Sequence, residues 1–444
     1  MNWSAIVLAT AVLVQGGAGR EPQPAALRTF PETLMARRLA DPDRIWTEAD
    51  LLPIVMAQGP DVLAAKAHRL TAVKLAKAAR AAPLSGFSLS AEYANNAGSS
   101  PWLYGASLDL AADGGVRKST RLTLSDLDRL QADQDLLNQL WAARSDLAKA
   151  ISARRAADEA VQLSQRLSDA RQAAVDLMEA RVSAGEDARP LALAARVDLA
   201  LAHRRVAEAL ARQGQANLDL AGVLGLSPTA VQGLKLAVPI SPGESVNLPA
   251  TLDVVTGRSD VLAAVIDYDR AEAALRLEVA RQWPEIRFGP GYSWDHGVVK
   301  LPFNLALVLP PADLNRANIR AAEAKRQEAA KALEAVQAQV MTQVDRARES
   351  LGRARMQLAI IRDRDLPTAQ GVVSVAMRAL KAGEADRIDA LTAQAAMIEV
   401  QLSEVEAQAS LETAVVDLEA AVRTPTDPQD LKIIMAEMQS GTAK

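Results

Sequence analysis

One uninterrupted stretch of the chain, from Lys118 to Arg181, contains neither glycine nor proline. A helix over these roughly 60 residues would be about 90 Å long, because an α-helix rises about 1.5 Å per residue. A second long helical stretch runs from Leu314 to Leu366 and stops before a proline. Helices of this length exceed the size of an ordinary globular domain, so the chain must fold into something elongated.

The apolar residues within the first stretch recur at coiled-coil spacing, as Leu136, Leu140, Leu147 and Ile151 show. The positions between them carry Arg, Asp, Gln and Glu, which favours exposed polar faces. Only 6 Trp, 4 Tyr and 4 Phe occur among 444 residues, too few for several ordinary globular cores. We therefore predict a mainly α-helical protein with a small β part, built on long antiparallel coiled-coil helices.

Charge and residue usage exclude several functional classes. The 50 Lys and Arg and 54 Asp and Glu residues are interspersed and give a net charge of −4, which offers no basic surface for nucleic acid. Cysteine is absent, which excludes disulfides, thiol catalysis and iron–sulfur clusters. His68, His203 and His296 lie far apart, and the common phosphate-binding, dinucleotide-binding and zinc-protease motifs are missing. We predict no enzyme activity, no cofactor and no metal site.

The sequence contains an internal repeat. Residues 61–65 (Asp-Val-Leu-Ala-Ala) recur letter for letter at residues 260–264, and Tyr93 and Tyr292 are separated by the same number of positions. The period is too long for a solenoid, so one ancestral unit occurs twice. We place repeat 1 at residues 46–225, a linker rich in Pro and Gly at 226–257, and repeat 2 at 258–424.

Each repeat contains a predicted strand hairpin, at residues 87–110 and 286–309. Apolar and small polar residues alternate strictly in these segments, which is the period of a β-strand. A hairpin on a soluble core gives the same alternation, but four strands beside very long helices have no evident second layer to pack on. We therefore expect the apolar face to meet lipid and the polar face to meet water. The predicted lipid-facing residues are Phe87, Leu89, Tyr93, Tyr104, Leu108, Phe288, Tyr292, Phe303, Leu305 and Leu307.

The N-terminus indicates export. An apolar run from Ser4 to Val14 is followed by small residues and Arg20, as in a secretory signal peptide, which we place at residues 1–19. The run is too short to span a bilayer. Residues 20–45 are expected to form an N-terminal extension, and residues 425–444 a C-terminal tail.

Together these residues resemble the TolC-like outer-membrane efflux protein family. The resemblance rests on Trp46-Thr-Glu-Ala-Asp-Leu51 leading to Pro60-Asp61-Val62, on its echo Arg258-Ser-Asp260-Val261, on the two strand hairpins, and on two segments ending in Ala-Gly-Glu, at 181–186 and 378–384. It extends over nearly the whole chain. Residues 309–319 and Ala322-Glu-Ala are similar to the heavy-metal branch of the family.

The resemblance implies a homotrimer in the outer membrane and periplasm of a Gram-negative bacterium. Each protomer would add four strands to a shared 12-stranded outer-membrane β-barrel, and the long helices would form a periplasmic α-barrel. Four strands alone cannot close a barrel, which agrees with this implication. The function implied is the exit duct of a tripartite efflux pump, working with a periplasmic adaptor protein and an inner-membrane transporter.

The resemblance also implies two kinds of site at the far ends of the helices. The tips at 182–188 and 380–386 would contact the adaptor through Gly185, Glu186, Gly383 and Glu384. Asp389, supported by Asp386, would line a periplasmic gate. Simpler roles account for the same residues: a glycine allows the chain to reverse after a helix, and a carboxylate in the first turn of a helix is favoured by the helix dipole.

Other functions stay open at this point. A soluble periplasmic coiled-coil scaffold would explain the helices but not the paired strand hairpins. A periplasmic enzyme or binding protein would need a convergent polar pocket. The outer-membrane duct of a type I protein secretion system would share every feature described so far.

Overall fold

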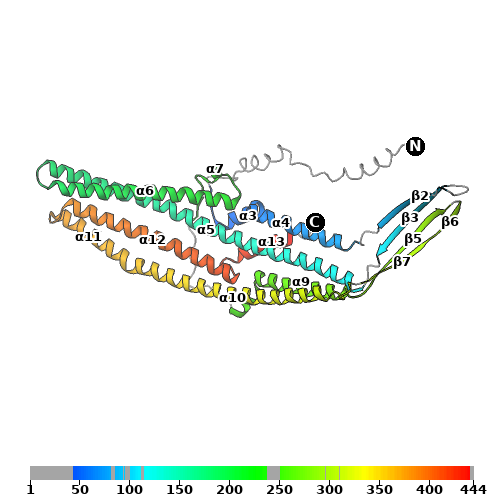
Figure 1. Cartoon of the computed structure of the whole chain (residues 1–444). Coiled ribbons are helices and arrows are strands. Elements are labelled where there is room, and N and C mark those ends of the chain that lie inside the picture. The colour runs from blue at the N-terminus through cyan, green and yellow to red at the C-terminus, as the bar shows by residue number, and fades with distance from the viewer. Residues whose placement is uncertain are drawn as a thin grey trace.

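Figure 1 shows the fold in a computed structural model, which describes residues 44–81, 86–93, 95, 101–111, 115–237, 251–295, 297–309 and 311–440. The predicted signal peptide, and nearly all of the predicted N-terminal extension, lie outside these residues. The described chain is elongated, with strands at one end and helical tips at the other. The prediction of a mainly α-helical protein with a small β part is confirmed.

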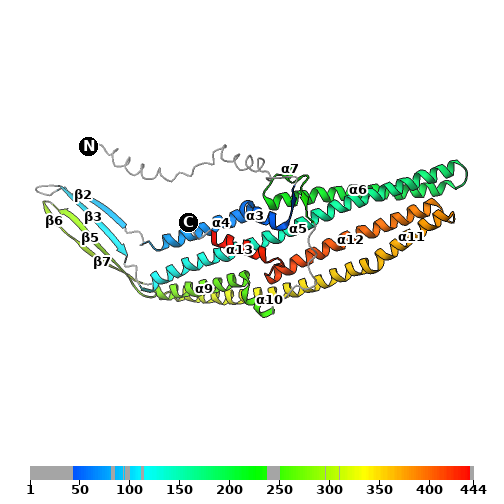
Figure 2. The same cartoon turned by 180° about the vertical axis from the view of Figure 1, so that it is seen from behind.

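The helices form one long layer. Toward the tips, α6 packs on α5, α5 on α12, and α12 on α10 and α11, and the view from behind shows the same order (Figure 2). Toward the strands, α4 packs on α5, α5 on α9, and α9 on α10. The first long helix is confirmed, because α5 has 69 residues. The helices of the layer are α4 (Pro60–Ala79), α5 (Gly115–Ser183), α6 (Arg189–Leu224), α9 (Ser259–Ala280), α10 (Arg316–Ile360), α11 (Leu366–Ala382) and α12 (Arg387–Val422).

The second long helix does not stop at Leu366 as the sequence suggested. A π-helical turn, η2 (Ile361–Asp365), joins α10 to α11, and Pro367 lies in the first turn of α11. In this turn the Leu366 N–H donates to the carbonyl of Ile361, five residues earlier. The wider turn accommodates a proline, which lacks an N–H and collides with the carbonyl four residues before it in a regular α-helix.

At one end of the molecule the strands form an antiparallel sheet, in which β2 pairs with β3, β3 with β5, and β5 with both β6 and β7. The pairing of β3 with β5 joins the two hairpins, and β1 and β4 form a separate parallel pair. The return strand of the second hairpin was predicted as one segment but is divided into β6 and β7. Leu301 and Pro302 lie between these two strands, and Pro302 has no N–H to donate to a ladder. The strands are β2 (Gly86–Tyr93), β3 (Trp102–Ala111), β5 (Glu285–Asp295), β6 (Val298–Lys300) and β7 (Phe303–Val308).

A compact core lies near the middle of the molecule. It contains Leu136, Leu140, Leu220 and Leu224, and also Ile434, which is fully buried although residues 425–444 were expected to be a tail. Residues of this segment form a helix, α13, that packs against α3 and α5. The remaining elements here are β1 (Ile45–Trp46), α3 (Glu48–Gln58), α7 (Pro228–Val231), β4 (Lys235–Leu236), α8 (Thr251–Gly257) and α13 (Pro428–Ser440).

The long helices are rich in alanine and in charged residues. Within the part of the chain that the structure describes, no helix combines the length and the apolar character needed to cross a membrane. Their burial instead follows the coiled-coil pattern, since Leu136, Leu140, Leu147 and Ile151 are all buried in α5.

Candidate functional site

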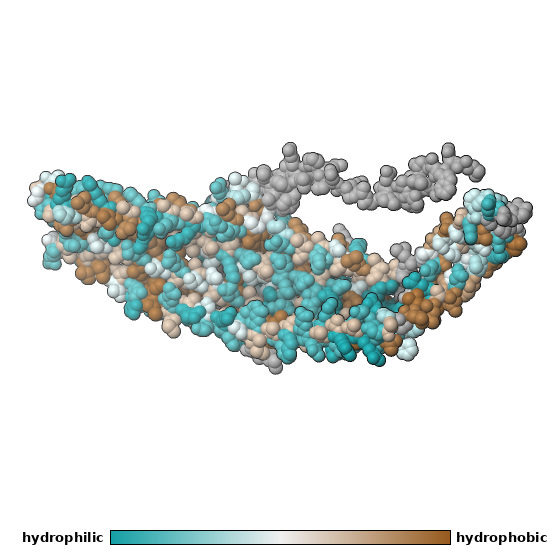
Figure 3. Space-filling model, viewed as in Figure 1, coloured by the Kyte–Doolittle hydropathy of each residue, from teal (hydrophilic) through white to brown (hydrophobic). Residues whose placement is uncertain are grey.

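The sheet has one apolar face and one polar face. Its register places Phe87 opposite Leu108, and Phe288 opposite Leu305, so the apolar residues of all four main strands lie on the same side. All ten residues predicted for this apolar face lie on it; Phe288 is half-buried and the other nine are exposed. Figure 3 shows hydrophobic side chains gathered on the arm that the strands form.

The large apolar side chains on this face of the sheet are unusually exposed to solvent in the single chain. Leu89 is 75% exposed and Leu305 is 71% exposed, and apolar side chains gathered on one exposed face are typical of a surface that contacts protein, ligand or membrane. A row of aromatic rings crosses the sheet, with centroids of Tyr93 and Trp102 5.1 Å apart, and of Tyr104 and Trp294 6.1 Å apart. Aromatic residues of this kind are enriched where a membrane meets water.

The opposite face of the sheet is polar. The hydroxyl groups of Ser88 and Ser107 are 2.7 Å apart, and Arg287 pairs with Asp109 at 3.4 Å. Glycine and serine occupy many of the other positions on this face, which keeps it small as well as polar. The two faces of the sheet therefore suit two different solvents.

The two helical tips have the same backbone geometry. Gly185 and Gly383 adopt φ angles of +76° and +75°, a left-handed conformation that favours glycine. In each tip the N–H of the following glutamate donates to a carbonyl five residues earlier, at 2.9 Å, so the helix ends in a Schellman motif. The predicted chain reversals are thus present, and Glu186 and Glu384 are exposed.

An arginine that the sequence did not single out holds the two tips together. Arg181, in the last turn of α5, pairs with Asp187 at 2.7 Å between Nε and Oδ2, and also forms an ion pair with Asp386 of the second tip. Asp386 therefore has a defined partner within the same protomer. The sequence shows a cation in the last helical turn before Gly185, but it does not show that this cation pairs with Asp386, some 200 positions further along the chain.

Asp386 and Asp389 form a capping box at the start of α12. The Ile388 N–H donates to Asp386 Oδ1 at 3.4 Å, and the Asp386 N–H donates to Asp389 Oδ2 at 3.1 Å. These bonds account for both carboxylates as helix caps. The Asp389 side chain nevertheless remains exposed to solvent.

The middle of the molecule contains a buried charge cluster that the sequence did not reveal. Arg144 of α5 lies 3.0 Å from Asp430 of α13 (Nε to Oδ2), forms an ion pair with Glu419 of α12, and lies 3.6 Å from Glu48 of α3 (Nη2 to Oε1). The side chains of Arg144, Glu419 and Asp430 are only 5%, 3% and 3% exposed. One guanidinium thus ties four helices together.

Glu48 is the least well accommodated member of this cluster. Burial, partly offset by Arg144, raises the pKa of its carboxyl from 4.5 to about 7. The folded state therefore holds the proton more tightly than the unfolded state, and stability falls as the pH rises from about 4.5 through 7.

We expect Glu48→Gln to raise the free energy of unfolding by about 1 kcal/mol at pH 8 and to change it little at pH 5. The full pKa shift would give a larger value, but the Glu48 side chain is 36% exposed and water screens part of it. Thermal unfolding at both pH values measures the effect, with Glu349→Gln, in an exposed ion pair, as the control. An equal change at pH 5 and pH 8 would contradict the assignment.

Within the described ranges, no group of three or more His, Asp or Glu side chains is placed to hold a metal ion. The described part of the chain combines a two-faced sheet, a long helical layer and paired tips. These features define a class of proteins, the subunits of channels whose sheet and helices form one continuous wall.

Comparison with known proteins agrees with this class. The family model described as "Outer membrane efflux protein" matches residues 51–226 and 253–422. The chain belongs to the outer membrane efflux protein family, whose fold is that of channel proteins rather than enzymes. No curated protein sequence matches the chain significantly.

Solved structures share the fold. The outer-membrane channel OprN is 17% identical, with 89% of this chain and 96% of that chain covered and a TM-score of 0.73. The Campylobacter jejuni CmeC outer membrane channel is 13% identical, with 88% and 89% covered and a TM-score of 0.75. The open state of the Neisseria gonorrhoeae MtrE outer membrane channel is 18% identical, with 85% and 89% covered and a TM-score of 0.71.

Proposed function

We propose that this protein is the outer-membrane exit duct of a tripartite efflux pump, through which substrates pass without chemical change. The observation that carries the proposal is the sheet with one apolar and one polar face, continuous with helices that reach far from it. The apolar face would lie against lipid and the polar face would line water. A soluble periplasmic scaffold would instead leave the large apolar side chains of this face, including nine of the ten predicted ones, exposed to water.

The two long edges of the protomer support a closed ring. The sheet ends in β2 on one side and β7 on the other, and each of them pairs on one side only among the described strands. The outermost helix of the layer is α6 on the side of β2, and α10 and α11 are outermost on the side of β7 (Figure 1). Two different edges that meet between copies generate a ring, and three copies, the number implied by the family, would give 12 strands.

Exposed apolar stripes follow both helical edges. On α6 the residues Leu193, Val197 and Leu201 are 51%, 60% and 45% exposed, and they recur at every fourth position. On the other edge, Met356 of α10 and Val375 of α11 are 66% and 57% exposed. Pairing of these stripes between neighbouring protomers would bury both and would form a helical barrel.

The tips are the part of the duct that would contact a periplasmic adaptor and, through it, an inner-membrane transporter. Gly185 and Gly383 shape the two reversals, and Glu186 and Glu384 project from them as exposed carboxylates. The same duct would also serve type I protein secretion, because the transporter that docks on it would determine the cargo.

Asp389 and Asp386 would form the selective element of the periplasmic entrance. Threefold symmetry would bring three copies of the exposed Asp389 around one axis, where like charges attract cations. We expect Asp389→Ala to reduce cation selectivity and block by divalent ions in single-channel recordings. Asp363→Ala, which removes a carboxylate from η2, is the control. Unaltered selectivity and block in Asp389→Ala would place the constriction elsewhere.

Membrane fractionation combined with native mass in mild detergent tests the proposed function as a whole. The duct should be recovered in the outer-membrane fraction, and its mass should correspond to three copies. A monomer that stays in solution without detergent would support the scaffold instead.

A further inference from the structure

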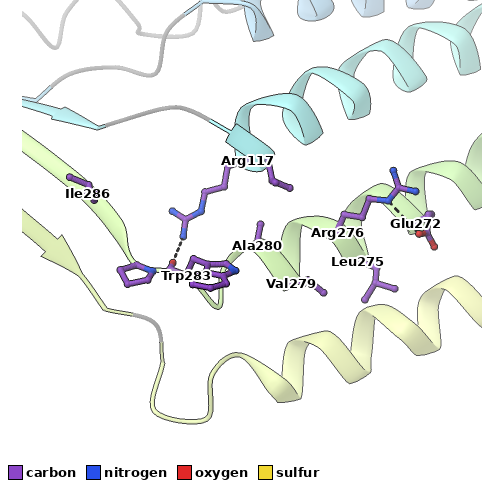
Figure 4. Close-up of a pocket in the computed structure, with 10 residues that line it drawn as sticks. Arg117, Glu272, Leu275, Arg276, Val279, Ala280, Trp283 and Ile286 are labelled. Carbon is purple, nitrogen blue, oxygen red and sulfur yellow. Dashed lines mark hydrogen bonds and ion pairs between the residues drawn. The ribbon is translucent and has the colours of Figure 1, made fainter.

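A cavity of about 630 Å³ lies where the helical layer meets the sheet. Its walls come from the start of α5, the end of α9 and the start of β5, and include Val116, Arg117, Arg276, Val279, Trp283 and Ile286 (Figure 4). The cavity has the size of a small-molecule site. Neither the proposed conduction pathway nor the tips make use of it.

The cavity borders the apolar face of the sheet. Ile286 lines the cavity and also belongs to that face, because it pairs with Leu307 across β5 and β7. Trp283 is 74% exposed and Val279 is 42% exposed, so the apolar surface continues past the end of the sheet onto α9. The cavity therefore lies at the boundary where the apolar face ends and the charged helices begin.

The walls of the cavity are apolar and cationic at once. Its charged lining residues are Arg117, Arg276 and Glu272. Glu272 pairs with Arg276 at 3.4 Å and with Arg326 of α10 at 3.0 Å, so its charge is shared between two arginines. The hydrogen bond from Arg326 lowers the pKa of the Glu272 carboxyl, which keeps it ionised at neutral pH.

The arginines are held in position by the surrounding structure. Arg117 Nη2 donates to the backbone carbonyl of Trp283 at 3.0 Å, which links the start of α5 to the segment before β5. Arg276 is 69% exposed and approaches Glu272 through Nε, so its outer edge is directed toward solvent. An anionic group entering the cavity would meet a guanidinium edge above an apolar floor.

We propose that this cavity binds a glycerophospholipid of the membrane leaflet next to the helices. The proposal rests on the proposed function, since it requires the apolar face to lie in a membrane. The phosphate would bind the guanidinium group of Arg276, and the first part of an acyl chain would run toward the sheet and pack on Val279 and Ile286. The Trp283 indole has the amphipathic character suited to this depth of a membrane. A free phosphate ion would use only the cationic part of the walls.

Native mass spectrometry of the delipidated trimer, titrated with phosphatidylglycerol or phosphatidylethanolamine, tests this inference. We expect up to three retained lipids per trimer. The double substitution Arg276→Ala and Trp283→Ala should weaken binding about tenfold, equivalent to about 1.4 kcal/mol. Arg353→Ala, which removes an equally exposed arginine on α10, should leave binding unchanged. Inorganic phosphate in excess should not displace the lipid.

The outcomes separate this inference from the proposed function. Trimers that retain no phospholipid, or that retain it equally in the double variant, would overturn the lipid site and leave the duct standing. Displacement by inorganic phosphate alone would show an anion site and overturn the choice of a lipid. A protein that forms no trimers and no membrane association would overturn both.

Discussion

Leu305→Arg is expected to prevent most of the protein from assembling in the membrane, whereas Asn304→Arg should be tolerated. The two residues are neighbours in β7, but Leu305 lies on the apolar face and Asn304 on the polar face. An arginine facing lipid costs about 2 to 4 kcal/mol near the bilayer midplane and less near the interfaces. In a symmetric trimer this cost arises three times.

The amount of trimer in the outer-membrane fraction measures this effect. Both variants add the same charge to the same strand, so they differ only in the face of the sheet that carries it. Equal assembly of the two variants would show that the apolar face does not meet lipid.

Arg144→Met should lower the free energy of unfolding by about 3 to 5 kcal/mol, because it leaves buried carboxylates without their cation. Glu419 and Asp430 are each about 3% exposed, and neither can turn to water without moving α12 or α13. Methionine fills a similar volume, so the loss reports the charge rather than a cavity. Arg353→Met, in an ion pair that is 71% and 70% exposed, should change stability by less than about 1 kcal/mol.

The pH dependence of this loss gives an independent check. Burial raises the pKa of Asp430, and it raises that of Glu48 to about 7. Without Arg144 these carboxyls take up protons more readily, so the folded variant should recover stability as the pH falls. Thermal unfolding should therefore show a smaller deficit at pH 5 than at pH 8. A deficit independent of pH would mean that packing, not charge, is lost.

Local periodicity made much of the fold predictable. The absence of glycine and proline over residues 118–181 predicted α5, and strict alternation predicted which side chains share a face of the sheet. These features depend only on neighbours a few positions apart, which is why the sequence reveals them. Gly185 and Gly383 were likewise readable as helix ends, because glycine readily adopts the left-handed conformation that lets the chain reverse there.

Features that depend on distant partners were not predictable. Nothing near Arg144 in the sequence indicates Glu419 or Asp430, and without those contacts α13 looked like a tail. The link from Arg181 to Asp386 likewise joins two repeats. Pro367 was misread for a different reason, since a wider helical turn upstream relieves the collision that normally ends a helix.

The central claim is that free edges of the sheet pair between copies to close a ring. The chain has no cysteine, so pairs can be introduced without removing any. Ser88 or Ser90 of β2 can be combined with Asn304 or Ala306 of β7, all on the polar face. Within one protomer these edges are three strand spacings apart, about 14 Å, and a disulfide requires Cα atoms within about 7 Å.

Oxidation of these double-cysteine variants in membranes is the most direct measurement. If β2 of one copy lies beside β7 of the next, at least one pair should give covalent dimers and trimers on a non-reducing gel. No species larger than a trimer should form, because a ring of three has no free edge. Monomers only, for every pair tested, or a ladder that continues beyond three copies, would contradict the closed ring.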